Sequence, residues 1–220
     1  QTDTGVKMSD LRKRMESGSK RMSDIVASFS LQPTMPFSYY GKEKLASAWG
    51  SFVADNVEVD VKCDLTFRKC IETTSPPVFG RKQITENIYI TEALAVVNIS
   101  FFLERLNYAC YKHAYKRYGK RLNVIAYIEG GDNDLRENTS IADVDKRLHT
   151  HLLLQRPSHI IFDDFKLLVL RCWNDTPWGY LQHTIEEIKT IKGSSKYGVK
   201  SGMDNIDLTN TYYDDSVSCN

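Results

Sequence analysis

The segment VEVDVKCDLTFR, residues 57–68, restricts the fold more than any other stretch of the chain. Its odd-numbered positions carry apolar side chains and its even-numbered positions carry polar or charged ones. Strict alternation predicts a β-strand with one face against a core and one polar face. A strand with one buried face belongs to a sheet that is covered on one side, which argues against an all-helical fold.

Three further strands are predicted from apolar runs bounded by turn residues, at 121–129, 147–154 and 178–188. Helical spacing and helix boundary residues predict helices at 41–55, 91–118, 159–174 and 193–202. Strands and helices alternate irregularly, which indicates an α+β fold with a largely antiparallel sheet and flanking helices. The polar residues 1–40 are expected to form a flexible or helical leader, and residues 204–220 a ragged acidic tail.

The charge of the chain is nearly balanced but unevenly placed. The net charge is +1, and 41% hydrophobic and 26% charged residues are ordinary values for a globular domain. Residues 105–121 carry six lysines and arginines and no acid. On charge alone a solvated helix face is the simpler interpretation, although a local basic stripe can bind phosphate.

Cysteine usage and apolar runs exclude several other classes. The five cysteines are odd in number and form no CxxC pair, which disfavours a disulfide framework and a zinc knuckle, and favours a reducing interior. No apolar run approaches the ~20 residues that span a bilayer, so we expect no membrane partner. The absence of a GxxxxGK phosphate loop argues against an ATP-driven motor.

Two histidines lie close together in the predicted strand 147–154. Alternation places Leu148, Thr150, Leu152 and Leu154 on one face and Arg147, His149 and His151 on the other. With the leucines on the core, both imidazoles point to the open face, at a spacing that suits one metal ion. The other interpretation is chance, since the chain contains five histidines.

A third ligand is expected from Glu129, at the end of the preceding strand. If the two strands pair antiparallel, this carboxylate completes a two-histidine, one-carboxylate set with positions open for water and substrate. Such a set suits Mn²⁺ or another borderline ion better than Mg²⁺, which prefers oxygen ligands. Glu129 as a solvated strand-end acid is the alternative, with His159 and His183 as weaker substitute ligands.

A candidate nucleophile lies in SKYGVKSG, residues 195–202. On a helix, Tyr197 and Lys200 share one face. A tyrosine phenolate can attack phosphorus, and a lysine one turn away can favour the phenolate or stabilise the leaving charge. The pattern is weak alone, because Tyr39 and Lys42 have the same spacing and a packing aromatic beside a surface lysine is common.

Three segments together resemble a known family. CDLTFR (63–68), RLHTHLLL (147–154) and SKYGVKSG (195–202) resemble motifs one, two and three of the HUH endonucleases, in the order found in rolling-circle replication initiators. The resemblance covers roughly residues 55–202, and with YIEGG it is particularly similar to single-domain initiators of bacterial plasmids and phages. The order and spacing of these motifs favour Tyr197 over Tyr39 as the nucleophile. The chain departs from the family pattern at Thr150, where the family usually has a bulky apolar residue. It also lacks the helicase segment that many family members carry.

The resemblance implies a five-stranded antiparallel sheet in a ferredoxin-like arrangement, within an endonuclease domain at 41–203. His149, His151 and Glu129 are expected to hold a divalent metal, Mn²⁺ or Mg²⁺, on the scissile phosphate. Tyr197 is expected to form a 5′-phosphotyrosine bond and leave a free 3′-OH. Lys200 would assist, and Thr66 would give structural support near the site.

The implied substrate is single-stranded or hairpin DNA at an origin, with a separate helicase and DNA polymerase as partners in the cytoplasm of a bacterial host. The nick would start rolling-circle replication or attack a competing element's origin. The non-enzymatic alternative is an origin-binding regulator that keeps the fold without the chemistry. A histidine-triad hydrolase is disfavoured because Leu153 stands where a third histidine is needed, and a two-histidine phosphoesterase because no second His-x-Thr/Ser motif follows.

Overall fold

The computed structural model describes residues 39–74, 85–130 and 147–214. Most of the predicted leader and the end of the predicted acidic tail lie outside these segments. Within them, no helix combines the length and the apolar character that crossing a bilayer requires. The cysteines of the described segments are free thiols: Cys63, Cys70, Cys110 and Cys172.

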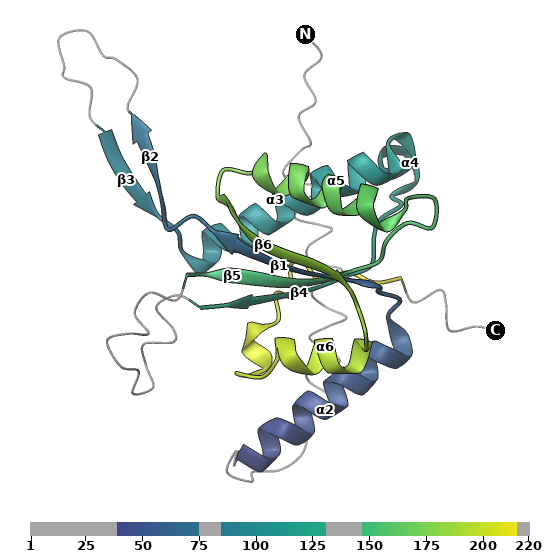
Figure 1. Ribbon diagram of the computed structural model, residues 1–220. Helices are drawn as coiled ribbons and strands as arrows, with labels where there is room; N and C mark the ends of the chain where they lie inside the picture. Colours follow the sequence, from purple (N-terminus) through teal and green to yellow (C-terminus); the bar gives the residue numbers. More distant parts are fainter. Residues whose placement is uncertain (1–38, 75–84, 131–146, 215–220) are drawn as a thin grey trace, which may run out of the picture.

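The centre of the molecule is a four-stranded sheet in which every neighbouring pair runs antiparallel. In sheet order its strands are β4 (Val124–Glu129), β5 (His149–Leu154), β1 (Val61–Phe67) and β6 (Gly179–Glu187). Helices pack on both faces (Figure 1), so the α+β class with an antiparallel sheet is confirmed. The expected number of five strands is wrong, since the described residues place four strands in this sheet.

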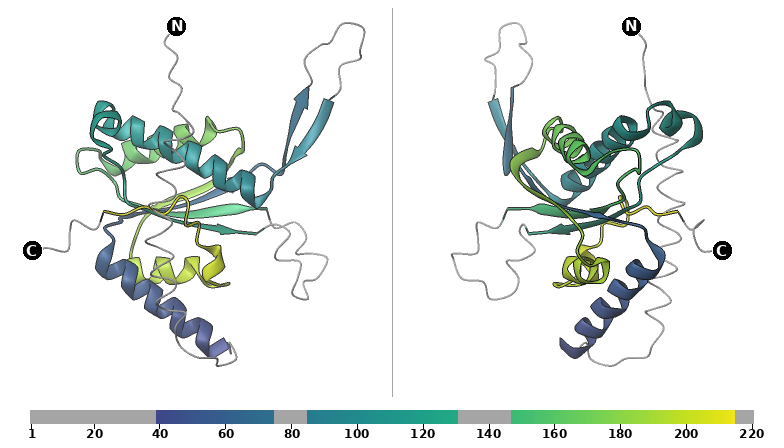
Figure 2. Two further views of the ribbon diagram at one scale, coloured as in Figure 1. Left: turned by 180° about the vertical axis from the view of Figure 1, so that it is seen from behind. Right: turned by 45° about the vertical axis from the view of Figure 1, so that its right-hand side comes forward.

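Two more strands form a separate ribbon. β2 (Cys70–Thr74) pairs antiparallel with β3 (Thr85–Tyr89), and the ribbon projects from one end of the molecule in Figures 1 and 2. All of β3 is exposed to solvent, and β2 is exposed or partly so. These residues hydrogen-bond to each other rather than to the central sheet, which is why they do not supply a fifth strand.

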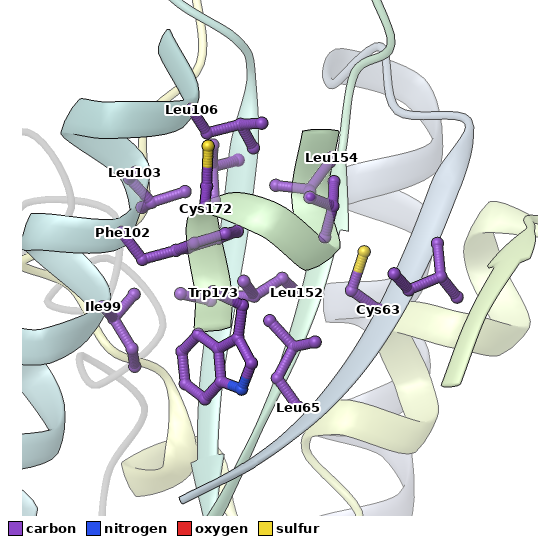
Figure 3. Packing of buried hydrophobic residues seen from close by; sticks show 14 of the residues in the cluster. Cys63, Leu65, Ile99, Phe102, Leu103, Leu106, Leu152, Leu154, Cys172 and Trp173 are labelled. Atoms are coloured by element: carbon purple, nitrogen blue, oxygen red, sulfur yellow. The ribbon is translucent and has the colours of Figure 1, made fainter. Parts of the chain in front are cut away.

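The alternation of β1 places its apolar residues in the main core, as the sequence predicts. Val61, Cys63, Leu65 and Phe67 are fully buried, and the residues between them are half-buried. This face packs against the helices α3 (Glu92–Tyr111) and α5 (Phe162–Asn174) (Figure 3). The Trp173 ring centroid lies 5.1 Å from that of Phe67 and 5.5 Å from that of Phe102, both edge to face.

The opposite face of the sheet is also covered, which corrects the expectation that the histidines point to an open face. The helices α2 (Tyr39–Asn56) and α6 (Ile191–Gly198) lie there, on the far side from α3 and α5 (Figure 1). Ile125, Tyr127 and Leu153 are buried against them in a second apolar cluster. The Trp49 indole N–H donates a hydrogen bond of 2.9 Å to the Tyr127 hydroxyl inside this cluster. β4 and β5 are therefore buried on both faces over most of their length.

The long helix expected at 91–118 is two helices. It begins as predicted, with the Thr91 side chain accepting a hydrogen bond from the Leu94 amide, and α3 runs to Tyr111. The backbone of Lys112 then takes φ 50°, ψ −120°, which interrupts the helix before α4 (His113–Tyr118). Gly119 ends α4 with φ 68°, at the position predicted for the helix end.

Residues 204–214, assigned by sequence to the acidic tail, instead run beside β4. Tyr212 and Val124 exchange backbone hydrogen bonds of 2.6 and 2.8 Å, and Ile206 bridges to Tyr127. A short helical turn, η3 (Met203–Asn205), directly precedes Ile206. Ile206 and Asp207 are buried, so this segment covers the outer edge of the sheet.

Asp207 makes the stability of this edge pH-dependent. Burial outweighs the hydrogen bonds from Asn210 and Thr209 and raises its pKa to about 6. An unfolded aspartate has a pKa near 3.9, so the folded state is favoured by protonation. This contribution is present below about pH 4 and is lost as the pH rises through 6. We expect Asp207→Asn to remove about 2–3 kcal/mol of pH dependence from the free energy of unfolding.

Urea denaturation of the wild type and the variant at a series of pH values between 4 and 8 measures this difference. Asp204→Asn is the matched control, because Asp204 lies three residues earlier and is exposed. Superimposable pH profiles for Asp207→Asn and the wild type would contradict the assignment.

Candidate metal centre and its tyrosine

The pairing of β4 with β5 brings the three predicted metal ligands together. Glu129 lies directly opposite His149 in the antiparallel register, and His151 follows two residues later on the same face. One ligand atom from each of these residues lies within 4.8 Å of the other two. The side chains are 12%, 29% and 7% exposed for Glu129, His149 and His151, so the cluster lies just beneath the surface.

Each imidazole uses one nitrogen for orientation and turns the other toward the carboxylate. The His149 Nδ1 lies 3.0 Å from the Arg147 carbonyl oxygen, and the His151 Nδ1 lies 2.5 Å from Asp64 Oδ1. An N–H at Nδ1 leaves Nε2 as the metal-binding atom, the arrangement usual for metal-ligating histidines. The two Nε2 atoms lie 3.5 and 2.9 Å from Glu129 Oε2. This donor set fits a divalent metal ion.

In this cluster the carboxylates and the neighbouring cations stabilise each other's charged forms. Burial opposes ionisation of Glu129, but its hydrogen bonds with His149, His151 and Lys200 outweigh burial and hold its pKa well below the usual range. In the same way, burial is outweighed at His151 by the carboxylates of Asp64 and Glu129, which raise its pKa. Two carboxylates thus stabilise a positive charge at the position between them, from a proton or from a cation.

Asp64 is a site residue that the sequence analysis missed. It lies opposite His151 in the register of β1 with β5, and its hydrogen bonds with His151 and Lys62 outweigh burial and lower its pKa. The signal for it was present, because Asp64 occupies the polar face of the alternating strand. Thr66, expected as structural support, lies opposite His149 in the same register.

Tyr197 lies against the metal cluster, near the end of α6. Its ring centroid is 5.5 Å from that of His151, and 47% of the residue is exposed. Lys200 lies two residues beyond the helix rather than on it, because α6 ends at Gly198. A turn after the helix nevertheless keeps Lys200 close to Tyr197, since the Lys200 amide donates a hydrogen bond of 3.1 Å to the Tyr197 carbonyl.

The lysine connects the tyrosine to the metal ligands. Lys200 Nζ donates a hydrogen bond of 2.9 Å to the Tyr197 hydroxyl and lies 3.0 Å from Glu129 Oε1. Burial opposes its charge, but the hydrogen bonds with Tyr197 and Glu129 outweigh burial and raise its pKa. A second cation, Lys62, has its Nζ 5.3 Å from the centre of the Tyr197 ring. A continuous polar network therefore joins the tyrosine hydroxyl to the cluster.

The two substitute ligands lie elsewhere. His159 Nε2 is 3.3 Å from the Cys110 carbonyl oxygen, on the α3 side of the sheet. His183 pairs with Leu65 across β6 and β1 and does not belong to the metal cluster. Among the described residues, the grouping able to hold a metal is the one that the sequence predicts.

Gly198 allows α6 to lie directly on the sheet. A Cβ atom at this position would lie 2.6–2.7 Å from three atoms of the Tyr127 ring. Tyr127 is fully buried, so its ring has no room to move away. The absence of a side chain at Gly198 therefore sets the height of Tyr197 above His151.

Comparison of the chain with family models, curated proteins and solved structures finds no match. The functional interpretation therefore depends on the geometry of the site.

We expect Gly198→Ala to destabilise the protein by about 1–3 kcal/mol, because it overpacks the contact with Tyr127. Thermal and urea denaturation measure the loss. Gly41→Ala in α2 is the control, since a Cβ there meets nothing within 4 Å. Unchanged stability of Gly198→Ala, or an equal loss in Gly41→Ala, would show that α6 is not held by this contact.

We expect Asp64→Asn to weaken Mn²⁺ binding about 10–100-fold, because the His151 ring loses the carboxylate that orients it. Isothermal titration calorimetry of the metal-free protein with Mn²⁺ measures the affinity. Glu187→Gln, an exposed carboxylate of β6, serves as control and is expected to bind like the wild type. Equal Mn²⁺ affinities for the wild type, Asp64→Asn and Glu187→Gln would show that Asp64 does not contribute to metal binding.

Proposed function

We propose that the chain is a metal-dependent DNA endonuclease of the HUH type, which nicks and rejoins one strand through a covalent tyrosine intermediate. The observation that carries the proposal is the hydrogen bond between Lys200 and the Tyr197 hydroxyl, with the same lysine ion-paired to Glu129 of the His149–His151 cluster. A nucleophile, a cation and a metal-ligand set in direct contact are the parts that phosphoryl transfer requires.

The proposed reaction is a transesterification at phosphorus. The Tyr197 hydroxyl loses its proton to water and its oxygen forms a bond to the phosphorus. The bond from phosphorus to the 3′ oxygen breaks, and that oxygen takes up a proton from water to become a free 3′-OH. Because the Lys200 ammonium donates to the Tyr197 oxygen, it favours the phenolate over the phenol. Attack by a 3′-OH on the phosphotyrosine reverses the step, so the same residues support cleavage and rejoining.

Glu129, His149 and His151 are the residues proposed to hold the metal. A bound divalent ion would polarise the phosphoryl oxygens of the substrate. Two imidazole nitrogens favour Mn²⁺ or another borderline ion over Mg²⁺, whose preferred ligands are oxygens. Asp64 and the Arg147 carbonyl have a positioning role, because each holds the second nitrogen of one imidazole.

Single-stranded DNA or an extruded hairpin at an origin is the proposed substrate. About half of Tyr197 is exposed beside the nearly buried metal cluster, so a flexible strand can bring a phosphate to it more easily than a duplex can. The proposed partners are a separate helicase and a DNA polymerase, in the cytoplasm of a bacterial host cell. The same chemistry serves initiation of the element's own replication or attack on a competitor's origin.

We expect Tyr197→Phe to abolish the covalent protein–DNA adduct, because the attacking oxygen is removed. The assay incubates the protein with a pool of random single-stranded oligonucleotides and Mn²⁺, and detects adducts on denaturing gels. Tyr39→Phe is the matched control, since Tyr39 begins the chain's other Tyr-x-x-Lys pattern. Sequencing the trapped DNA identifies the target and whose origin contains it.

A Tyr197→Phe protein that still forms the adduct would assign the nucleophile elsewhere. A wild-type protein that binds the pool but forms no adduct with Mn²⁺ would favour the non-catalytic alternative, an origin-binding regulator. Adduct formation that persists in excess chelator would contradict the role of the metal.

A further inference from the structure

A second charged surface lies away from the tyrosine site. We call it the α3–α4 basic surface; its residues are Lys112, Lys116, Arg117, Lys120 and Arg121. All are exposed except Arg121, which is half-buried. In the described part of the chain no carboxylate forms an ion pair with any of them, whereas Arg105, Arg156 and Lys196 are each paired to an acid. These cations are thus available to an external anion.

Within the described residues, tyrosine rings lie beneath four of these five cations, all except Arg117. Lys112 and Lys116 lie 5.8 and 5.0 Å from the centre of the Tyr108 ring, and Lys120 lies 5.0 Å from that of Tyr111. Arg121 lies 5.8 and 5.6 Å from the ring centres of Tyr115 and Tyr212. Cation–π contacts of this kind restrict long side chains that would otherwise be mobile. The surface is therefore an ordered array of positive charges.

The backbone at Lys112 is unusual for a lysine. Its φ of 50° with ψ of −120° lies in a region that glycine adopts freely and that strains other residues. This strained turn directs α4 away from the line of α3 and brings Lys112 and Lys116 to the same tyrosine ring.

We propose that the α3–α4 basic surface binds the phosphate backbone of double-stranded DNA, outside the tyrosine site. The rings of Tyr108, Tyr111 and Tyr115 carry cations and are therefore poor platforms for stacking bases, whereas Tyr118 is 80% exposed and offers an open ring. A single open ring among several lysines and arginines suits contacts to phosphates better than a run of stacked single-stranded bases. A lipid bilayer fits less well, because surface-binding helices insert a continuous apolar face, whereas among the described tyrosines at 108, 111, 115 and 118 only Tyr118 has no cation over its ring. The choice of DNA rests on the proposed function; the choice of a duplex backbone rests on the surface itself.

The surface and the tyrosine site lie on opposite sides of the sheet. Figures 1 and 2 show α3 and α4 on one face and α6 on the other. A duplex held at α4 therefore makes contacts separate from those of a strand at Tyr197. The arrangement suits a protein that holds the duplex part of a site while it cleaves an unpaired part.

The test measures binding of a short fluorescent duplex DNA over a range of salt concentrations. We expect the triple variant Lys116→Gln, Arg117→Gln, Lys120→Gln to bind at least about tenfold more weakly near 50 mM salt. The slope of log affinity against log salt should fall by about 2–3, since each phosphate contact contributes about 0.9. The control triple Lys42→Gln, Lys189→Gln, Lys192→Gln makes the same charge change at exposed lysines near α2 and α6, and should leave affinity and slope unchanged.

A second variant separates binding from folding. Lys112→Gly relieves the backbone strain and removes one cation, so we expect weaker duplex binding with a thermal midpoint no lower than that of the wild type. Duplex binding and a salt slope equal to the wild type in the Lys116/Arg117/Lys120 variant would overturn the proposal. Binding of the wild type to anionic vesicles through these residues, without binding to the duplex, would also overturn the proposal.

A failure of duplex binding at the α3–α4 basic surface can be told apart from a failure of the proposed endonuclease function. The triple variant should still form the Tyr197 adduct on a short single strand, because that site is untouched. Absence of the adduct in the wild type would refute the endonuclease and leave the duplex measurement to decide the surface.

Discussion

The antiparallel register of β4, β5 and β1 is the constraint on which the site depends. It places Glu129 opposite His149 and Asp64 opposite His151, so two neighbouring strands supply the carboxylates on either side of one histidine strand. A slip of one residue would turn both imidazoles to the other face of the sheet. Burial opposes this slip, because it would move the two imidazoles into the main apolar core, which now holds Leu152 and Leu154. The Thr150 hydroxyl adds a hydrogen bond of 2.8 Å to the Tyr127 carbonyl.

The two sides of the sheet have different roles. On one side α3 and α5 form an apolar core, and their outer surface carries the α3–α4 basic surface. On the other side a smaller apolar cluster around Tyr127 shares the face with the polar network. Tyr127 connects the apolar cluster to the site: its hydroxyl accepts a hydrogen bond from Trp49, and its ring packs against Gly198 of α6, the helix that carries Tyr197. The position of Tyr197 is therefore set by packing, while its hydroxyl is set by Lys200.

Much of this arrangement was predictable from local patterns. Alternation identified β1, and side-chain type and spacing identified the three residues of the cluster that could hold a metal and the proximity of Tyr197 to Lys200. Asp64 was missed because alternation gives the face of a residue and not its partner on the next strand. The break at Lys112 has no glycine or proline to signal it, and the contact of residues 206–212 with β4 joins segments about eighty residues apart. Such long-range pairings depend on tertiary packing, which one sequence does not reveal. The α+β class followed from the residues, whereas the wrong number of five strands came from the family resemblance.

The most direct test of the account is to locate the covalent bond itself. Adduct formed on single-stranded DNA is digested with nuclease and trypsin, and the modified peptide is sequenced by mass spectrometry. Because Tyr197 follows Lys196 and precedes Lys200, the account predicts a nucleotide phosphate on the tyrosine of the peptide YGVK, residues 197–200. A nucleotide on any other residue, or on none, would contradict the assignment of Tyr197 as the nucleophile of this centre.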